Sequence, residues 1–438
     1  MAFEDEGPIC QDTGMSNSLL CLDTPEQGDT IRAALECVGR PSVRHSLSIQ
    51  YPQDQMAQNK LRFQRHPDYR YADRVPILFG IFARYFLQEF GINFEEYFRD
   101  PETQFHWQLQ FQKWAIENVP DDRCQEPVVT VGPDFENVMN TAAFGGHVEW
   151  LAENPPRVRP TIRQPDEVGR VRIPEVHEGF WAKYVRWWQT MTDLAKETEV
   201  TFNGQPGRVA VLPLGVQWIG PHMVAIDLVG DDFYWWMLEC PQACHQLLET
   251  ITNGLLHAET CFRQLDQTPR LNFAVAEDSA QVMSAELFRK FCVPYDNQLF
   301  DAFGSGLRDG RGMHMCGKSD HLHTTLLEEE RITSFQLFGH NVKPAVARKN
   351  LGGKCCLWGN LDPILLLDGP KEKIRESAGE FLEALGPCRG IVLGDGANVC
   401  PGTPLDHLAV VSEAAERYAR ERPELFDSEG SSPLSRSR

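Results

Sequence analysis

The chain has 438 residues, of which 42% are hydrophobic and 24% charged, so it can bury a large core and shows neither a disordered nor a fibrous composition. Its formal net charge of −20 excludes nucleic acid and anionic membranes as natural partners, because such surfaces are bound through Lys and Arg. We expect a cytoplasmic protein, since no apolar run reaches the roughly 18 residues of a membrane helix and the start, Met1 to Glu6, is acidic where a signal peptide would be basic.

The first regular pattern begins near Arg74, after a polar N-terminal stretch. From there short apolar or β-branched runs alternate with polar loops and helical patterns, which is typical of repeated βα units. Eight such units favour an α/β fold of the closed (β/α)₈ TIM-barrel type, with insertions, over two domains or a doubly wound sheet. We predict a partly disordered N-terminal extension over 1–73, the barrel over 74–420 and a disordered tail over 421–438. The predicted strands are Val75–Phe79, Val128–Val131, Val209–Leu212, Leu271–Val275, Met313–Cys316, Phe335–Phe338, Cys355–Trp358 and Ile391–Leu393.

The last two helices have the clearest pattern. Residues 374–385 carry apolar side chains at helical spacing, and Gly386-Pro387 ends that helix. A second helix begins at Pro404 and repeats the pattern.

Polar side chains follow most of the predicted strands, where a barrel places its active site. Loops are polar in any case, so the value of this pattern lies in the geometry that a barrel would impose on it. The side chains are Arg84 after the first strand, Asp134 and Glu136 after the second, Glu277 and Asp278 after the fourth, His314 and Cys316 at the fifth, His340 after the sixth, Asn360 and Asp362 after the seventh, and Asp395 and Cys400 after the eighth.

The tripeptide His314-Met315-Cys316 carries two transition-metal ligands on one face of an extended segment, because residues i and i+2 point the same way. Two ligands do not close a metal site, and a half-buried strand that happens to contain His and Cys is the alternative. Cys400 in a loop, His340, and a carboxylate from Glu277 or Asp278 could complete a zinc site. The other cysteines fit reduced thiols, since the count of thirteen is odd and no secretory signal is present.

The remaining candidates have structural alternatives as well. Arg84 could hold an anionic group of a substrate, or form an exposed salt bridge. Asn360 and Asp362 could line a site, or cap the helix that follows.

Several motifs in their order resemble the uroporphyrinogen decarboxylase superfamily over roughly residues 74–420. That resemblance implies a (β/α)₈ barrel, and one of two chemistries: cofactor-free decarboxylation of uroporphyrinogen, or zinc-dependent transfer of a methyl group from a corrinoid protein to a thiol. The motifs are Ala276-Glu277-Asp278, Met283 to Phe288, Pro294-Tyr295, His314-Met315-Cys316-Gly317, Gly359 to Pro363 and Pro401 to Pro404.

The two classes differ at particular positions. The decarboxylases are similar at Phe82 to Tyr85, but they carry a further arginine where this chain has Gly80 and a histidine in the loop that here reads Gly394 to Ala397. The methyltransferases resemble the chain at His314 to Gly317, where the His and Cys bind zinc with a later cysteine. Without gaps that cysteine falls at Ala397, so either Cys400 takes its role, which we expect, or the third ligand is missing.

The resemblance thus implies methyl transfer from a methyl-corrinoid, carried by a partner protein, to a small-molecule thiol. The alternatives are decarboxylation of a tetrapyrrole, and a non-catalytic barrel that binds a corrinoid or tetrapyrrole. The implied zinc ligands are His314, Cys316 and Cys400, with Glu277 or Asp278 as a fourth ligand or base, and the implied substrate-binding residues are Arg84, Asp134, Asn360, Asp362 and His340.

Overall fold

Parallel strands in chain order form the centre of the fold, which a computed structural model describes for residues 46–65, 72–305, 310–388 and 390–426. Both faces of these strands are covered, and all five residues of the last strand are buried. The five-stranded parallel sheet consists of β8 (Phe273–Ala276), β9 (Arg311–His314), β10 (Ser334–Gln336), β11 (Cys356–Leu361) and β12 (Ile391–Asp395).

This sheet continues past both of its edge strands. Beside β12, Ile77 forms a parallel bridge with Leu393, and the Leu78 N–H donates to the Leu393 carbonyl at 3.0 Å. Beside β8, Ile219 forms a parallel bridge with Ala276. A further parallel pair joins β2 (Val128–Val131) to β7 (Arg208–Val211). The fold is the (β/α)₈ barrel that the βα pattern predicts.

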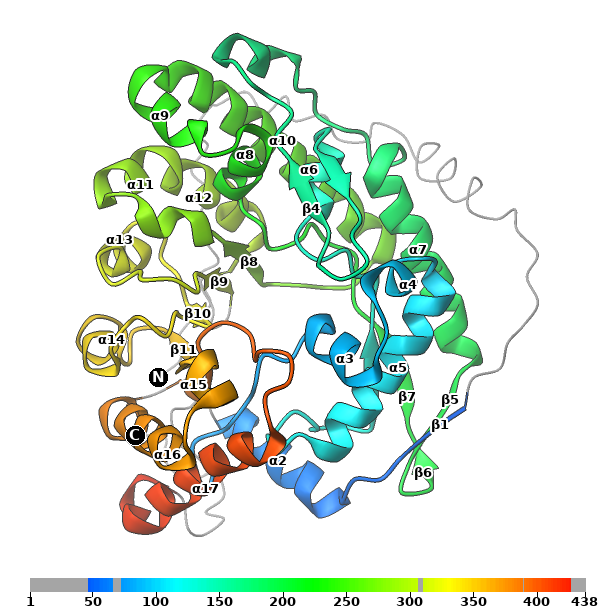
Figure 1. The fold of residues 1–438 in the computed structure, drawn as a ribbon, viewed down its shortest axis with the longest axis vertical. Helices are drawn as coiled ribbons and strands as arrows, with labels where there is room; N and C mark the ends of the chain where they lie inside the picture. Colours follow the sequence, from blue (N-terminus) through cyan, green and yellow to red (C-terminus); the bar gives the residue numbers. More distant parts are fainter. Residues whose placement is uncertain (1–45, 66–71, 306–309, 389, 427–438) are drawn as a thin grey trace, which may run out of the picture. The chain divides into compact units, whose positions relative to one another are not determined.

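Helices follow the strands and cover their outer side, and Figure 1 shows α11 to α16 outside β8 to β11. Within the described part of the chain no helix combines the length and apolar character needed to cross a membrane. The helices after the first three strand positions are α3 (Ala83–Phe90), α4 (Phe94–Tyr97), α5 (Pro101–Asn118), α6 (Met139–Ala143), α7 (Gly179–Glu197), α8 (Pro221–Val229), α9 (Asp232–Glu239) and α10 (Pro241–Asp266). Those after β8 to β12 are α11 (Ala285–Phe291), α12 (Val293–Phe303), α13 (His323–Glu328), α14 (Pro344–Leu351), α15 (Pro363–Asp368), α16 (Lys371–Leu385) and α17 (Leu405–Glu421).

Short elements interrupt the loops. The 3₁₀ helices η2 (Pro165–Arg170), η3 (Asp278–Val282) and η4 (Pro423–Leu425) follow α6, β8 and α17 respectively. A small hairpin pairs β3 (His147–Glu149) with β4 (Arg157–Arg159). Of these elements η3 matters most for the site, because it begins at Asp278.

Two strand boundaries differ from the predicted ones at candidate residues. β9 ends at His314, so Cys316 lies in the loop and not at the strand end. β11 is longer than predicted and contains Asn360, because the backbone pairing with β12 continues through Asn360↔Gly394 to Leu361↔Asp395. The predicted α16 stripe is confirmed, since Ile374 and the other apolar residues of that pattern are buried.

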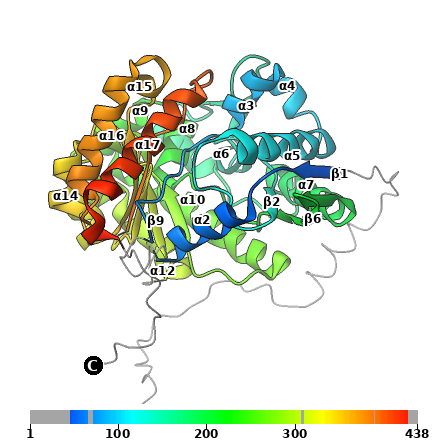
Figure 2. The same ribbon diagram turned by 90° about the horizontal axis from the view of Figure 1, so that it is seen from below.

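A segment ahead of the barrel strands packs against the barrel. β1 (Ser46–Ile49) pairs in parallel with β5 (Glu199–Phe202), which turns into β6 (Gln205–Pro206), and Figure 2 shows β1 close to β6. On α2 (Gln53–Arg65) the Asn59 amide donates to the Cys124 carbonyl at 3.1 Å. Residues 46–65 of the predicted extension therefore contribute to the folded unit. Most of the disorder predicted for the two ends falls outside the described residues.

Asp122 ties this segment to the first strand position. Its carboxylate is almost fully buried and accepts from the Arg62 guanidinium at 2.7 Å and from both terminal nitrogens of Arg74 at 2.8 Å. It also accepts from the Ile77 N–H at 2.8 Å. One buried carboxylate thus connects α2, the chain before the barrel and a strand position.

Asp122→Ala should lower the free energy of unfolding by about 3–5 kcal/mol, because it leaves the buried Arg74 guanidinium without its counter-charge. The matched control is Glu126→Ala, which removes an ion pair whose two side chains are 44% and 51% exposed, and it should cost about 1 kcal/mol or less. Urea denaturation of both variants measures the difference. Equal losses of stability in the two variants would show that the buried ion pairs of Asp122 contribute no more than an exposed ion pair.

Candidate metal centre

Three ligand-type side chains meet where β8 and β9 end. His314 is the last residue of β9, Cys316 follows two residues later, and Asp278 is the first residue of η3 after β8. Their ligand atoms all lie within 4.8 Å of one another. His314 and Cys316, the predicted ligand pair, therefore stay close together although Cys316 lies in the loop. Asp278, one of the two predicted carboxylates, lies beside them.

The imidazole of His314 is oriented by a backbone carbonyl. Its Nδ1 lies 3.0 Å from the Gln336 carbonyl oxygen on β10, and its Nε2 lies 3.5 Å from Asp278 Oδ1. A carbonyl oxygen only accepts hydrogen bonds, so Nδ1 carries the hydrogen and Nε2 is directed at the carboxylate. A hydrogen bond from one ring nitrogen to a backbone carbonyl, like that from Nδ1 to Gln336, is the usual way in which a protein sets the tautomer of a metal-binding histidine.

The carboxylate of Asp278 holds the loop after β9 in place, because it accepts from the Cys316 N–H at 2.7 Å. Burial by itself would raise the pKa of Asp278, but hydrogen bonds from His314 and Cys316 outweigh it and hold the pKa below its ordinary value. Burial likewise opposes the charged form of His314, yet Asp278 and Cys316 raise the pKa of that imidazole to about 10. The space between these side chains therefore stabilises positive charge.

A side chain at position 317 would meet a close contact in this loop. A Cβ at this position would lie 1.6 Å from Gln281 Oε1, which itself accepts from the Lys318 N–H at 3.1 Å. On the other side, a Cβ at Gly339 would lie 2.0 Å from the Gly317 carbonyl oxygen. The glycine after the cysteine thus lets the loop pack between η3 and the loop after β10.

The donor set fits zinc. Nitrogen, thiolate sulfur and carboxylate oxygen are the ligands that Zn²⁺ takes in proteins, and three protein ligands leave the open position that a catalytic zinc keeps. The 3.5 Å between His314 Nε2 and Asp278 Oδ1 is close to the separation of about 3.3 Å that tetrahedral geometry with bonds near 2.0 Å requires.

Glu277 points away from this group although it is the neighbour of Asp278. Its side chain is fully buried, with Oε2 3.2 Å from His222 Nδ1 and Oε1 accepting from the His222 N–H at 3.2 Å. A Cβ at Gly220 would lie 2.1 Å from Oε1, so a glycine is needed there. Of the two predicted carboxylates, the structure brings Asp278 to His314 and Cys316 and places Glu277 with His222 and Cys292.

Cys400 lies in the loop after β12, and the structure does not bring it into the group around His314. Its carbonyl accepts from the Thr403 N–H at 3.1 Å and from the Thr403 hydroxyl at 2.8 Å. Burial, and then the nearby carboxylates of Asp362 and Asp395, raise the pKa of its thiol. In this conformation Cys400 belongs to the loops after β11 and β12.

Arg84 and Asp134 both form hydrogen bonds with Glu136. Arg84 Nη2 donates to Glu136 Oε2 at 2.8 Å, and the arginine side chain is 40% exposed. Asp134 accepts from the Tyr97 hydroxyl at 3.1 Å and from the Glu136 N–H at 2.8 Å. Burial, followed by the charge of Glu136, raises the pKa of Asp134 to about 6.

Two of the other predicted substrate-binding residues, Asn360 and Asp362, form structural hydrogen bonds, whereas Nδ1 of His340 has no hydrogen-bond partner among the described residues. The Asn360 amide donates to the carbonyls of Gly339 at 3.0 Å and Val342 at 2.7 Å. Asp362 caps α15 by accepting from the Ile364 N–H at 2.9 Å, which is the structural alternative already considered for it. His340 is half-buried, and its backbone nitrogen would lie 2.5 Å from a Cβ at Gly396.

Sequence reasoning missed two sets of residues. The Gln336 carbonyl and the Gln281 side chain leave no signal, because a backbone acceptor and a steric contact depend only on the tertiary fold. His222, Cys292, Asp296 and Glu330 were also missed. Only Cys292 and Asp296 had a usable pattern, since a thiol and a carboxyl spaced i, i+4 share one helix face.

The chain is similar in sequence to one family of enzymes and in fold to a solved methyltransferase. The family model described as uroporphyrinogen decarboxylase (URO-D) matches residues 129–418. Uroporphyrinogen decarboxylase of Ovis aries is 28% identical over 201 residues, covering 42% of this chain and 50% of that protein, so the chain spans about half the length of that curated relative. The Chloroherpeton thalassium enzyme of the same name is 26% identical over 300 residues, covering 65% of this chain and 79% of the relative. Among solved structures, a methyltransferase from Methanosarcina mazei has a TM-score of 0.60 at 18% identity, covering 82% of this chain and 99% of that one, which shows a shared fold.

Gly317→Ala should weaken zinc binding at His314 and Cys316, because the added methyl group collides with the Gln281 amide. Truncating that amide in Gln281→Ala/Gly317→Ala should restore part of the lost affinity. Zinc titration monitored by competition with a chromogenic chelator measures both. A single Gly317→Ala variant with unchanged affinity would mean that the contact has no influence on the site.

Proposed function

Because this chain belongs to the uroporphyrinogen decarboxylase (URO-D) family of enzymes, we propose that it is a zinc-dependent methyltransferase. In this proposal the methyl group comes from a methyl-corrinoid carried by a partner protein, and the acceptor is a small-molecule thiol. The observation that carries the proposal is the Asp278, His314 and Cys316 group at the ends of β8 and β9.

The three side chains suit the chemistry of thiol alkylation. When bound, zinc would supply a Lewis acid that lowers the pKa of a thiol at its open position. His314 offers Nε2, because Gln336 fixes its Nδ1 hydrogen, and Asp278 positions Cys316 through the backbone N–H. In the overall reaction a sulfur–carbon bond forms, the cobalt–carbon bond breaks with its electron pair left on cobalt, and the thiol proton is released.

Arg84 is the proposed anchor for an anionic group on the thiol. It is half-exposed and follows the first strand position at the same end of the barrel. Glu136 orients its guanidinium through Nε and Nη2, which leaves Nη1 for a ligand. A thiol that carries a carboxylate or sulfonate is therefore the proposed acceptor class, with Asp134, Asn360, Asp362 and His340 lining the same end of the barrel.

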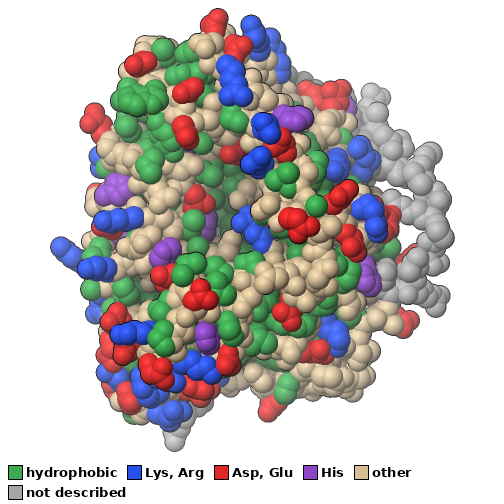
Figure 3. Space-filling view, in the orientation of Figure 1, with side chains coloured by type: hydrophobic (Ala, Val, Ile, Leu, Met, Phe, Trp, Pro, Cys, Tyr) green, Lys and Arg blue, Asp and Glu red, His purple; other side chains and the backbone are tan. Residues whose placement is uncertain are grey.

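Exposed apolar side chains lie beside the proposed zinc site, where the corrinoid protein would have to bind. Trp235 and Leu238 on α9 are 64% and 62% exposed, and Val282 at the end of η3 is 72% exposed. Figure 3 shows hydrophobic side chains gathered over α9. Because η3 also carries Asp278, a protein docked on this surface would sit next to the reacting groups.

Decarboxylation of a tetrapyrrole is the alternative, and the names of the relatives favour it. The geometry favours it less. Where the decarboxylases carry a further arginine this chain has Gly80, whose added Cβ would lie 3.2 Å from the buried Asp395 carboxylate. Metal-independent turnover of uroporphyrinogen would favour this alternative, and zinc content without thiol alkylation would favour a non-catalytic barrel.

Cys316→Ala and Asp278→Ala should each lose one equivalent of bound zinc and nearly all demethylation of methylcobalamin in the presence of a thiol. The reason is that each removes one of three proposed ligands. Elemental analysis measures the zinc, and the absorbance change of the corrinoid measures the demethylation. Full zinc together with full demethylation in Cys316→Ala would contradict the proposal.

Two cysteine variants serve as comparisons. Cys240→Ala removes a half-buried thiol between α9 and α10 and should change neither readout. Cys400 remains a predicted ligand that this conformation leaves outside the group. Loss of zinc in Cys400→Ala would return it to the ligand set, whereas retained zinc would leave Asp278 as the third ligand.

Arg84→Gln should raise the KM for an anionic thiol about three- to tenfold, the range expected for a half-exposed ionic contact. The KM for a neutral thiol of similar size should change little, because that thiol makes no such contact. Steady-state kinetics with the two thiols give the ratio. An equal change for both thiols would remove Arg84 from the binding site.

A further inference from the structure

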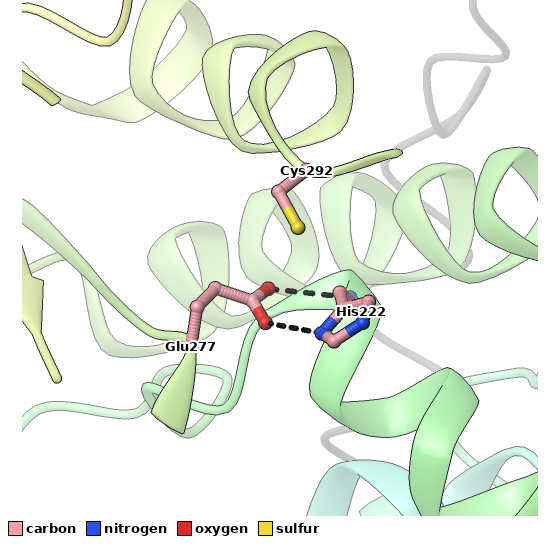
Figure 4. A group of neighbouring side chains, drawn as sticks. All are labelled: His222, Glu277 and Cys292. Atoms are coloured by element: carbon pink, nitrogen blue, oxygen red, sulfur yellow. Dashed lines mark hydrogen bonds and ion pairs between the residues drawn. The ribbon is translucent and has the colours of Figure 1, made fainter. Parts of the chain in front are cut away.

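A second group of ligand-type side chains lies apart from the proposed catalytic one, and Figure 4 shows three of its members. His222 is the second residue of α8, Glu277 lies between β8 and η3, and Cys292 lies between α11 and α12. The Glu277 carboxylate faces His222, and the Cys292 sulfur points toward the pair. The ligand atoms of these residues lie within 4.8 Å of one another.

Two more carboxyl groups adjoin the same point. Asp296 lies in the first turn of α12, and Glu330 follows α13. Asp296 interacts electrostatically with both Glu277 and Glu330, and Cys292 interacts with all three acidic groups. One imidazole, one thiol and three carboxyls from four separate stretches of chain thus converge, with Cys292 and Asp296 both at the start of α12.

This group is enclosed and lacks a basic partner. The exposed fraction is 1% for Cys292 and 0% for the other four residues. Among the described residues no N–H group donates to the carboxyl oxygens of Asp296 or Glu330, and Asp296 can hydrogen-bond to Glu277 and Glu330 only through a shared proton. Within the same part of the chain no Lys or Arg side chain forms an ion pair with any of the three acids. Buried carboxylates are costly without compensating positive charge, so either protons or a cation must occupy the centre of the group.

The types of donor favour a cation. A carboxyl cluster that only shares protons requires neither an imidazole nor a thiol, whereas nitrogen, sulfur and oxygen together form the usual donor set of zinc. The 3.2 Å between His222 Nδ1 and Glu277 Oε2 is close to the edge of about 3.3 Å expected for two ligands on tetrahedral zinc. Burial raises the pKa of Glu277 well above its ordinary value, and the backbone N–H groups of His222 and Met223 at the start of α8 oppose this only in part.

We propose that His222, Glu277, Cys292, Asp296 and Glu330 form a second, enclosed site for a divalent transition-metal cation of the zinc type. Its role is structural, because the enclosed ligands leave no position for a substrate. The ion would join α8, β8 and α12 directly behind the strand end that presents Asp278. The proposal is independent of methyl transfer, since it uses none of the residues proposed for that reaction.

A group that binds a cation and a group that only holds protons would differ in the amount of zinc bound per chain. Without a cation, burial first and then the neighbouring acidic groups raise the pKa of Asp296 and Glu330 well above their ordinary values, so these carboxyls hold protons. A divalent ion would displace protons from the group. The number of zinc ions bound per chain therefore distinguishes the two states.

The test uses the full chain, stripped of metal by a chelator, refilled with zinc alone and freed of excess. Elemental analysis should give two equivalents for the native protein and one for Cys316→Ala. The double variant Asp296→Asn/Glu330→Gln should also give one, and the combination of all three substitutions should give none. The amides keep the shape of the carboxyls, so the fold should be retained. The control Glu259→Gln alters a buried carboxylate that is paired with Arg263 and should keep both equivalents.

Cobalt provides a second readout for Cys292. In the Cys316→Ala background, bound Co²⁺ should show a thiolate-to-cobalt charge-transfer band that disappears in Cys292→Ser. The proposal would be overturned if the native chain bound only one equivalent of zinc and Cys316→Ala bound none. The group would then be a cluster of carboxyls that share protons. The proposal would also be overturned if the second equivalent survived Asp296→Asn/Glu330→Gln. These outcomes leave the proposed methyl transfer untouched, because that function fails only if Cys316→Ala keeps its zinc and activity.

Discussion

The arrangement of the site depends on the end of β8, where two adjacent carboxylates enter different environments. Glu277 lies between β8 and η3, and Asp278 is the first residue of η3, so the two side chains leave the backbone where the strand turns into a helix. Glu277 enters the enclosed space beside α8, and Asp278 faces His314 and Cys316. The Glu277 N–H donates to the His314 carbonyl at 3.1 Å, so the pairing of β8 with β9 sets which carboxylate goes where. Any shift of that register by one residue would exchange the two.

The close packing of loops around this strand end explains the glycines of the motifs. Gly220 admits the Glu277 carboxylate to the start of α8, and Gly317 admits the Gln281 amide. At Gly220 a Cβ would collide with the enclosed Glu277 carboxylate and with Val275, whereas at Gly317 it would collide with the end of the Gln281 side chain, which would have to move. The same packing gives the proposed zinc ligands little freedom, which is what a site with preset geometry requires.

Electrostatics at the two groups differ although both contain buried acidic residues. Around Asp278 an imidazole supplies positive charge, and the pKa of the carboxyl stays low. Around Asp296 the neighbours are acids and a thiol, and the pKa of the carboxyl rises because burial and the charge of Glu277 outweigh the hydrogen bond with Glu330. The first group can exist with its proton shared between His314 and Asp278, whereas the second needs protons or a cation to exist at all.

The sequence by itself determined the fold class and the proximity of His314 to Cys316. Both follow from local rules: the βα periodicity sets the order of strands in a barrel, and a spacing of two residues keeps two side chains close. Only the tertiary structure decided which carboxylate joins His314 and Cys316. It also decided where Cys400 lies and which glycines are in close contact with other side chains. The candidate carboxylates, Glu277 and Asp278, are adjacent and carry the same functional group, so sequence cannot rank them, while strand pairing and burial can. The cluster around Asp296 and Glu330 depends on helix packing across more than a hundred residues of chain, from His222 to Glu330, and no local pattern encodes such a contact.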